Sequence, residues 1–348
     1  MIEILKTGLT YDDVLLVPKY SDIYSRVDVS LKTRLVGDIF IDLPFVSANM
    51  DTVTGLEMAN VLNRHGAVGV IHRFMSTSDH VSAVAGQQGP RILCIGVKQE
   101  DLIKIEVLEV MGAVDAVLID VAHGHHQRVT DLIRTIKAKW PDMLVIAGNI
   151  ATYSGAVDLL DAGADSLKVG VGPGAACSTR TVAGAGYPQL SAIINVKNAI
   201  NQVASRTGKK ATLIADGGIK KSADVVKALA AGADSVMIGS LFAGTDEAPG
   251  ELILTETGKM KKYRGSSSAE VNEYLGLDRT AEGVATLIPY RGPVRSILMD
   301  LAGGVRSGLS YVGCRNIQEL HEDYIQMVQV THAGQVESRP NILESASN

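Results

Sequence analysis

The sequence has few cysteines and no long apolar run. Cys94, Cys177 and Cys314 are the three cysteines in 348 residues. Because their number is odd and they are scattered, they indicate no disulfide framework and are typical of a reducing compartment. No early segment resembles a signal peptide, and no apolar run is long enough to span a bilayer. We therefore expect a protein of the cytoplasm with no membrane partner.

The chain also lacks an excess of positive charge. It has 33 Lys and Arg residues against 38 Asp and Glu residues, a formal net charge of -5. This balance argues against a nucleic-acid partner. A hydrophobic content of 46% is ordinary for a globular protein, and 348 residues suit either one large α/β barrel or two smaller domains.

Short apolar runs rich in β-branched residues alternate with segments of helical periodicity. Eight such runs predict strands, at 44–48, 67–71, 91–96, 115–120, 143–148, 166–170, 212–216 and 235–239. Helical spacing lies between them, for example at 129–139, 156–162 and 223–231. The phrase AGAD occurs twice, at 162–165 and 231–234, where glycine marks the end of a helix before the next strand. The pattern predicts an α/β fold, a single (β/α)8 TIM barrel domain over 1–348, with a doubly wound sheet as the alternative.

Polar and glycine residues gather where the predicted strands end, which is where a barrel builds its ligand site. Those that follow the strands are Ser47, Asn49, Met50 and Asp51, then His72 and Arg73, Asp120 and 123–126, Gly148 and Asn149, Asp216, Gly217 and Gly218, and Gly239 and Ser240. Glycine turns after the seventh and eighth strands predict a phosphate site, and so a phosphorylated ligand. Taken singly, each of these glycines is better explained by a tight turn between strand and helix than by a ligand contact.

Cys177 lies in the glycine-rich segment KVGVGPGAACSTR (168–180), directly after the sixth predicted strand. A thiol on such a turn, with Thr179 two residues later, is typical of a nucleophile loop, because Gly170, Gly172 and Gly174 leave the backbone open to a ligand. The competing interpretation is a small buried hydrophobic residue.

Two further segments allow more than one interpretation. Asp120 is an acceptor for a ribose hydroxyl or a nicotinamide amide, or else a helix N-cap. The nearby histidines at 123–126 lie too close together on one loop to predict a metal centre.

The segment 251–289, rich in Gly, Ser and charge, is expected to be a mobile flap over the catalytic face, with a solvated loop as the alternative. Its polar clusters at 265–268 and 279–283 are the parts expected to close on a ligand.

Several ordered motifs carry a family resemblance over nearly the whole chain. They are LTYDDVLLVP (9–18), SANMDTV (47–53), IAGNIAT (146–152), KVGVGPGAACSTR (168–180), GYPQLSAI (186–193), IADGGI (214–219), MIGSLFAG (237–244) and GGVRSGLSYVG (303–313). In these motifs the chain resembles the inosine monophosphate dehydrogenase and guanosine monophosphate reductase family.

Within that family, three features resemble the reductase branch. No regulatory module is inserted between the second and third predicted strands. The flap carries Arg-x-x-Glu-Gly at 279–283 without the adjacent Arg-Tyr pair of the dehydrogenases, and GYPQLSA (186–192) is the reductase form. Two features point the other way: 330–340 is similar to dehydrogenase C-termini, and YRGSSS (263–268) lacks a methionine that both branches share.

The resemblance therefore implies a GMP reductase, which converts GMP to IMP and ammonia with NADPH through a covalent Cys177 intermediate. The alternative is an IMP dehydrogenase without the regulatory module, which converts IMP to XMP with NAD. A catalytically silent nucleotide-binding barrel is a further alternative, against which the presence of Cys177, Thr179 and Glu282 argues.

The resemblance also implies roles for individual residues. The catalytic residues are Cys177, Thr179 and Glu282. The substrate-binding residues are Ser47, Met50, Asp216, Gly217, Gly218, Gly239, Ser240, Gly265, Ser266, Ser267, Arg279 and Gly283. The cofactor-binding residues are Ser25, Arg26, Arg73, Asp120, Val121, Ala122 and Arg180 and, from a neighbouring subunit, Ser307, Gly308, Leu309 and Ser310.

Three further expectations come from the same resemblance. Backbone carbonyls of Gly172, Gly174 and Cys177 bind a monovalent cation, K⁺. Arg73 stands where the reductase has lysine, and keeps a positive charge for the 2′-phosphate of NADPH. The chain assembles as a homotetramer.

Overall fold

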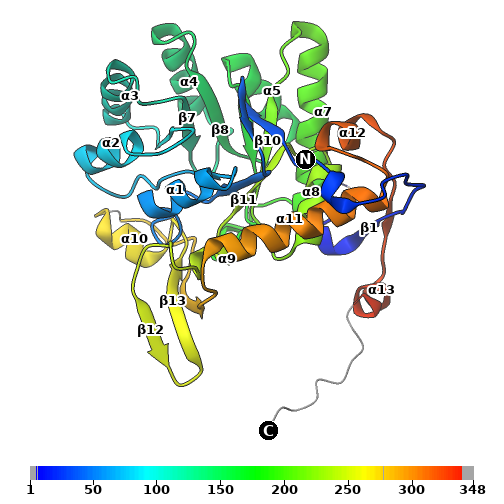
Figure 1. Cartoon of the computed structure of the whole chain (residues 1–348). Coiled ribbons are helices and arrows are strands. Elements are labelled where there is room, and N and C mark those ends of the chain that lie inside the picture. The colour runs from blue at the N-terminus through cyan, green and yellow to red at the C-terminus, as the bar shows by residue number, and fades with distance from the viewer. Residues whose placement is uncertain (1–4, 6, 277, 339–348) are drawn as a thin grey trace.

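Eight parallel strands form the centre of the computed structural model, which describes residues 5, 7–276 and 278–338. Hydrogen-bonded neighbours follow the order β5-β4-β11-β10-β9-β8-β7-β6, a nearly closed ring (Figure 1). The strands in chain order are β4 (Phe45–Ser47), β5 (Val68–Gly69), β6 (Ile92–Ile95), β7 (Ala116–Asp120), β8 (Leu144–Ile150), β9 (Ser166–Val169), β10 (Thr212–Asp216) and β11 (Ser235–Ile238). Each lies on one of the eight predicted runs, so the (β/α)8 barrel is confirmed and the doubly wound alternative is wrong.

Helices surround this ring in the alternating order that a (β/α)8 barrel requires. The longer ones are α1 (Leu56–Arg64), α2 (Thr77–Ala85), α3 (Glu100–Val110), α4 (Gln127–Lys139), α5 (Tyr153–Ala162), α7 (Gln189–Thr207), α8 (Ser222–Ala230) and α11 (Val294–Tyr311). The short ones are α6 (Thr179–Val182), α9 (Ser240–Ala243), α12 (Ile317–Glu322) and α13 (His332–Glu337). Among the described residues, no helix combines the length and apolar character needed to cross a membrane.

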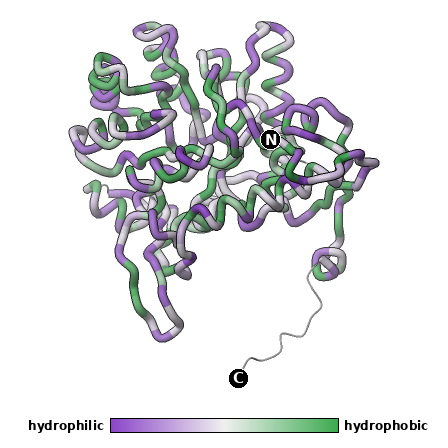
Figure 2. The backbone as a smooth tube through the Cα atoms, viewed as in Figure 1, coloured by the Kyte–Doolittle hydropathy of each residue, from purple (hydrophilic) through white to green (hydrophobic). Residues whose placement is uncertain are grey.

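The core sits inside the ring and between the ring and its helices. Residues of β6 and β11 are buried along their whole length, as expected of strands covered on both faces. Figure 2 shows the hydrophobic colour concentrated in these central strands and mixed with hydrophilic colour along the outer helices. Gly163, at φ +112°, ends α5, and Gly232, at φ +110°, follows α8, so both AGAD phrases end a helix as predicted.

The remaining strands lie outside the ring. In the N-terminal part, the 3-10 helix η1 (Tyr11–Asp13) leads into β1 (Val14–Leu16), which pairs with β15 (Met327–Gln329). A second 3-10 helix, η2 (Arg26–Asp28), precedes the hairpin of β2 (Thr33–Val36) and β3 (Ile39–Ile41). Between β5 and β6 the chain forms only α2, so the prediction that no regulatory module is inserted there is confirmed.

The segment after β11 is regularly folded rather than a loop. It contains β12 (Leu252–Thr255), β13 (Gly258–Arg264), α10 (Ala269–Tyr274) and β14 (Ala285–Pro289), and its strands form an antiparallel sheet in the order β12-β13-β14. The β12–β13 hairpin projects from the body of the molecule in Figure 1. The solvated-loop interpretation of 251–289 is therefore wrong, and the next element after the flap is α11.

Candidate functional site

The candidate site is a cavity of about 270 Å³ at the carboxyl ends of the barrel strands, continued by a second cavity of about 320 Å³. The two share a wall that includes Met50, Asp216, Gly217 and Tyr263. The predicted site residues in the first are Met50, Arg73, Asp120, Val121, Ala122, Gly172, Gly174, Cys177, Thr179, Asp216, Gly217, Gly265, Ser266, Ser267, Arg279, Glu282 and Gly283. The second adds Arg180, Gly218, Gly239 and Ser240. The structure thus brings together most of the residues that the resemblance assigned to substrate and cofactor.

Seven predicted site residues do not line either cavity. Ser47 is fully buried in β4, where its hydroxyl accepts a hydrogen bond of 2.7 Å from Thr54, so its side chain serves the core. The other six, which lie on or beside η2 and α11, are Ser25, Arg26, Ser307, Gly308, Leu309 and Ser310. Because η2 packs against α11 and the Arg26 guanidinium lies over the Tyr311 ring, 5.9 Å from its centroid, Ser25 and Arg26 belong to the same outer surface as Ser307–Ser310.

Cys177 is exposed on the loop after β9, so its interpretation as a small buried residue is wrong. Its Sγ donates to Thr179 Oγ1 at 3.3 Å, and Thr179 Oγ1 in turn donates to Glu282 Oε2 at 2.8 Å. The flap fixes this chain of contacts through two backbone bonds, from Ser178 N–H to the Glu282 carbonyl at 2.9 Å and from Val284 N–H to the Ala176 carbonyl at 2.9 Å. A nucleophile, a hydroxyl and a carboxylate are therefore connected in series at the cavity wall.

The turns after β9 and β10 require glycine because backbone packs against backbone there. Gly170 has φ +152°, and a Cβ atom on it would lie 2.1 Å from the Asp216 carbonyl oxygen. Gly217 has φ +95°, and a Cβ atom there would lie 2.9 Å from the Pro173 ring. A side chain at either position would push the Cys177 loop away from the end of β10.

Tyr263, at the end of β13, lines both cavities and was missed by sequence reasoning, since nothing distinguished it from an exposed residue of the flap. Its side chain is only 4% exposed, and a Cβ atom on Gly239 would lie 3.0 Å from its hydroxyl. Burial, together with the nearby Asp216 and Cys177, raises the pKa of Tyr263 to about 12. The phenol therefore stays protonated at neutral pH and is available as a donor beside the glycine turns.

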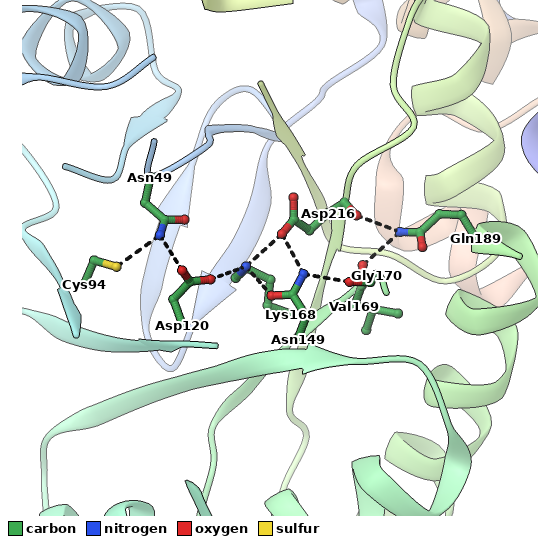
Figure 3. A network of polar contacts seen from close by, with 9 residues as sticks. All are labelled: Asn49, Cys94, Asp120, Asn149, Lys168, Val169, Gly170, Gln189 and Asp216. Atoms are coloured by element: carbon green, nitrogen blue, oxygen red, sulfur yellow. Dashed lines mark hydrogen bonds and ion pairs between the residues drawn. The ribbon is translucent and has the colours of Figure 1, made fainter. Parts of the chain in front are cut away.

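A network of largely buried polar side chains lies in the wall of the first cavity (Figure 3). Lys168 Nζ, from β9, lies 2.7 Å from Asp120 Oδ1 and 2.7 Å from Asp216 Oδ2, and it also donates to the side-chain oxygen of Asn149. Asn49 Nδ2 donates to Asp120 Oδ2 at 2.9 Å, and Asn149 Nδ2 donates to Asp216 Oδ2 at 2.8 Å. The residue missed here is Lys168; its one sequence signal was a single charge inside an apolar strand.

The lysine favours the ionised form of Asp120 in spite of burial. Burial alone would raise the pKa of Asp120, but the Lys168 ammonium, Arg73 and Asn49 lower it below its ordinary value. For Lys168, burial would lower the pKa, and the two carboxylates more than offset this and raise it. Asp120 and Lys168 therefore form an ion pair at neutral pH.

The flap is attached to the barrel through Arg264. Its Nε donates to Asp51 Oδ2 at 2.9 Å, on the loop after β4, and its Nη1 donates to Glu270 Oε2 at 2.9 Å. Further along, Arg279 Nε donates to the side-chain oxygen of the buried Asn272 at 2.8 Å, which holds the arginine at the cavity wall. Sequence reasoning named Asp51 and Arg279 but missed Arg264 and Asn272.

The histidines after β7 have other partners. His125 Nε2 lies 2.7 Å from Asp158 Oδ2, and His126 is the N-cap of α4, accepting from the Arg128 N–H at 3.1 Å. The N-cap interpretation of Asp120 is therefore wrong. Within the described ranges, no group of three or more His, Cys, Asp and Glu residues is arranged to hold a metal ion.

These observations define a (β/α)8 barrel with an exposed cysteine and glycine turns at the carboxyl ends of its strands. The model of the IMP dehydrogenase / GMP reductase domain matches residues 8–341, and the chain belongs to this family. It is 36% identical to the inosine-5'-monophosphate dehydrogenase of Borreliella burgdorferi, over 97% of this chain and 98% of that protein. It is 33% identical to the enzyme of the same name from Nitrosopumilus maritimus, over 97% and 98%, and 33% identical to that from Chlorobaculum parvum, over 98% and 97%.

The alignments with these relatives extend over 404, 482 and 494 positions, more than the 348 residues of this chain. The relatives therefore carry residues that this chain lacks. Absence of an inserted module does not distinguish the branches, because the barrel residues align throughout with proteins named as dehydrogenases.

The comparisons correct the expectation of a GMP reductase. The relatives carry the name of the dehydrogenase, so the reductase assignment, and NADPH with it, is wrong. The physical reason is that a hydroxyl and a carboxylate in series beside a thiol suit proton transfer to an amine or from water, so the contacts of Thr179 and Glu282 do not select deamination. Because the expectation of NADPH is wrong, the expected contact of Arg73 with its 2′-phosphate is wrong too. The Arg73 guanidinium lies over the Phe74 ring, 5.1 Å from its centroid.

Proposed function

We propose that the protein oxidises IMP to XMP, with NAD as the hydride acceptor and water as the source of the new oxygen. The observation that carries this proposal is the series of contacts from Cys177 through Thr179 to Glu282 at the wall of a cavity large enough for a nucleotide. The names of the relatives at 33–36% identity support the same reaction.

The nucleotide is held by the strand ends. Asp216 Oδ1 has no hydrogen-bond partner among the described residues and accepts from the ribose hydroxyls. Gly217, Gly218 and Gly239, with Ser240, surround the phosphate, where small side chains leave backbone N–H groups accessible. The base lies between Met50 and the flap, whose contacts are Gly265, Ser266, Ser267, Arg279 and Gly283.

The dinucleotide enters on the other side of Cys177, where the cavity is lined by Arg73, Asp120, Val121 and Ala122. These residues fit an anionic dinucleotide, because the Arg73 Nε is buried without a partner among the described residues and the guanidinium lines the cavity. NAD supplies a nicotinamide ring that takes a hydride from C2 of the purine. In the second cavity the Arg180 guanidinium donates to the Val171 and Tyr187 carbonyls, so it fixes the Cys177 loop.

The protein's own residues perform the covalent and hydrolytic steps. The Cys177 thiolate adds to C2 of the hypoxanthine, and after hydride loss the purine remains bonded to sulfur. Glu282 takes a proton from water through Thr179 Oγ1; the water oxygen bonds to C2, and the C–S bond breaks to return the thiolate and release XMP. Thr179 and Glu282 thus activate water in place of the Arg-Tyr pair, which the flap segment Arg279–Gly283 lacks.

A monovalent cation, K⁺, is proposed for the Cys177 loop. The carbonyls of Gly172 and Cys177 accept no hydrogen bond from the described residues, whereas that of Gly174 accepts from the Cys177 N–H at 3.0 Å. Two carbonyls with free lone pairs on one turn fit an oxygen-liganded cation. The cation would hold the loop in the conformation that presents Sγ to the base.

A homotetramer in the cytoplasm is proposed as the working form. The surface that holds Ser25, Arg26 and Ser307–Ser310 also exposes Tyr24 and Tyr311, which supports an interface there with a second copy of the chain. Light scattering of the purified protein tests the assembly, and a monomer at micromolar concentration would contradict it.

The assay that tests the reaction follows nicotinamide absorbance with two substrate pairs in parallel. With IMP and NAD we expect NADH and XMP in equal amounts, and with GMP and NADPH no turnover and no ammonia. The proposal would be overturned if the protein turns over GMP with NADPH and does not turn over IMP with NAD. It would also be overturned if protein that binds IMP turns over neither pair. Replacing K⁺ by a large organic cation should lower the rate without unfolding the protein.

A further inference from the structure

We propose that Lys168 is a positioning residue that holds the nucleotide carboxylate Asp216 and the dinucleotide carboxylate Asp120 in a single unit, so that both ligands depend on this one side chain. The inference deepens the proposed function and rests on it for the identity of the two ligands. Its basis is the juxtaposition in Figure 3, where the lysine lies between the two carboxylates.

The geometry uses all the donors that a lysine has. An ammonium carries three N–H groups, and Lys168 directs them to Asp120 Oδ1, Asp216 Oδ2 and the side-chain oxygen of Asn149. Asp120 ends β7, Asn149 lies in β8, Lys168 in β9 and Asp216 ends β10, so the contacts join four adjacent strands. No donor of the lysine remains for a ligand, which distinguishes positioning from direct binding.

Charge makes the lysine indispensable to both carboxylates. Lys168 is 2% exposed, and the side chains of Asp120 and Asp216 are 17% and 21% exposed. Two carboxylates so near each other and so little hydrated repel unless a cation lies between them. Without Lys168, either one carboxylate takes up a proton or the two separate, and both responses displace the oxygen atoms that face the ligands.

Each carboxylate also accepts a hydrogen bond from an asparagine amide. Asn49 donates to Asp120 Oδ2 at 2.9 Å, and Asn149 donates to Asp216 Oδ2 at 2.8 Å. Asp216 Oδ1 stays free for a ribose hydroxyl. A substitution of Lys168 should therefore weaken the binding of both IMP and NAD, whereas a substitution of either aspartate should weaken mainly one of them.

The test compares Lys168→Met with Asp216→Asn and Asp120→Asn in steady-state kinetics with IMP and NAD. We expect Lys168→Met to raise the KM values of both substrates by roughly tenfold to a hundredfold, the scale of a lost hydrogen bond to a charged group. Asp216→Asn should raise mainly the KM for IMP, and Asp120→Asn mainly the KM for NAD. Lys168→Arg, which keeps the charge, should recover most of both affinities.

Lys261→Met is the matched control, because Lys261 is also buried, at 4% exposed, and among the described residues its ammonium donates to the carbonyls of Thr245 and Ala248 and to no carboxylate. We expect it to lower the thermal midpoint without raising both KM values. The same double rise in Lys261→Met, a rise of one KM alone in Lys168→Met, or a loss of kcat with both KM values unchanged would each overturn the proposal. If Lys168→Met does not fold, Lys168→Gln carries the same comparison.

Calorimetric dissociation constants for IMP and NAD separate this inference from the proposed function. If the wild-type protein binds both ligands but makes no XMP, the function fails while the lysine test still stands on binding. If the wild-type protein is active and Lys168→Gln binds both ligands as tightly as wild type, only the positioning role fails.

Discussion

The two halves of the cavity wall are built in different ways. The Lys168 network lies in the barrel itself, with Asp120, Asn149, Lys168 and Asp216 on four adjacent strands and their polar atoms almost fully paired. The Cys177 relay is assembled from a loop and the flap, and its Thr179 and Glu282 are 103 residues apart. The groups proposed to bind the ligands are thus fixed by the barrel, while those proposed to react depend on the contact between the flap and the Cys177 loop.

This difference explains why the family was easier to establish than the reaction. In the proposed function, strand-end residues bind a nucleotide and a dinucleotide, as either direction of hydride transfer requires. The choice between releasing an amine and adding water is assigned to Glu282 of the flap, which is half-buried against the Cys177 loop. We therefore expect substitutions in the flap to change the chemistry with little effect on the barrel.

The largest effect is expected from Cys177→Ala, which removes the reacting atom but leaves the barrel intact. We expect turnover of IMP to fall by on the order of a thousandfold or more, since no other group supplies the covalent step. Binding of IMP, measured by calorimetry, should change little because the phosphate and ribose contacts come from β10 and β11. Retained turnover in pure protein would exclude the covalent mechanism.

Glu282→Gln separates the two chemical steps. Without the carboxylate, water activation should slow by on the order of a hundredfold, the usual effect of removing a positioned base. Hydride transfer should still occur once, so a rapid burst of NADH equal to the enzyme concentration should precede the slow steady state. Glu273→Gln, an exposed carboxylate on α10, is the control. Loss of the burst itself would show that Glu282 acts before hydrolysis.

Sequence patterns predicted the barrel and its strand-end residues well, for physical reasons. Each of the eight strands is a buried apolar run ending in polar or glycine residues, and parallel strands bring those ends together. Cys177 was predicted as a nucleophile because glycines precede it and Thr179 follows it. The sequence named Glu282 only as part of the polar cluster at 279–283. Its pairing with Thr179 came through the family resemblance, since residues so distant in sequence give no local signal.

The flap sheet and Lys168 escaped prediction because their signals resemble those of other structures. Lys259, Lys261 and Lys262 make β13 look like a solvated loop, although antiparallel pairing on both sides orders it. Lys168 looks like an anomaly in an apolar strand until β7 and β10 place carboxylates beside it. The branch of the family was predicted wrongly because a hydroxyl and a carboxylate such as those of Thr179 and Glu282 suit either release of an amine or addition of water.

Arg264→Gln is expected to have the smallest effect, and it tests how the two halves are joined. Arg264 connects the flap to Asp51 on the loop after β4, and the side chains are 20% and 12% exposed. Removing the guanidinium leaves the Asp51 carboxylate poorly hydrated, with an Oδ1 that already has no partner among the described residues. We expect the KM for IMP to rise roughly tenfold, the lower end for a charged hydrogen bond, while the NADH burst keeps its amplitude.

Lys262→Gln is the control for Arg264, because Lys262 contacts Glu270 at 2.6 Å with both side chains well exposed, at 46% and 40%. An exposed pair contributes little, so its loss should leave the KM for IMP within about twofold of wild type. Equal effects of the two variants would mean that general flap charge matters rather than the contact with the barrel. A larger effect of Arg264→Gln would mean that the contact between the flap and Asp51 of the barrel supports IMP binding, since Asp51 is the barrel group to which the flap arginine is hydrogen-bonded.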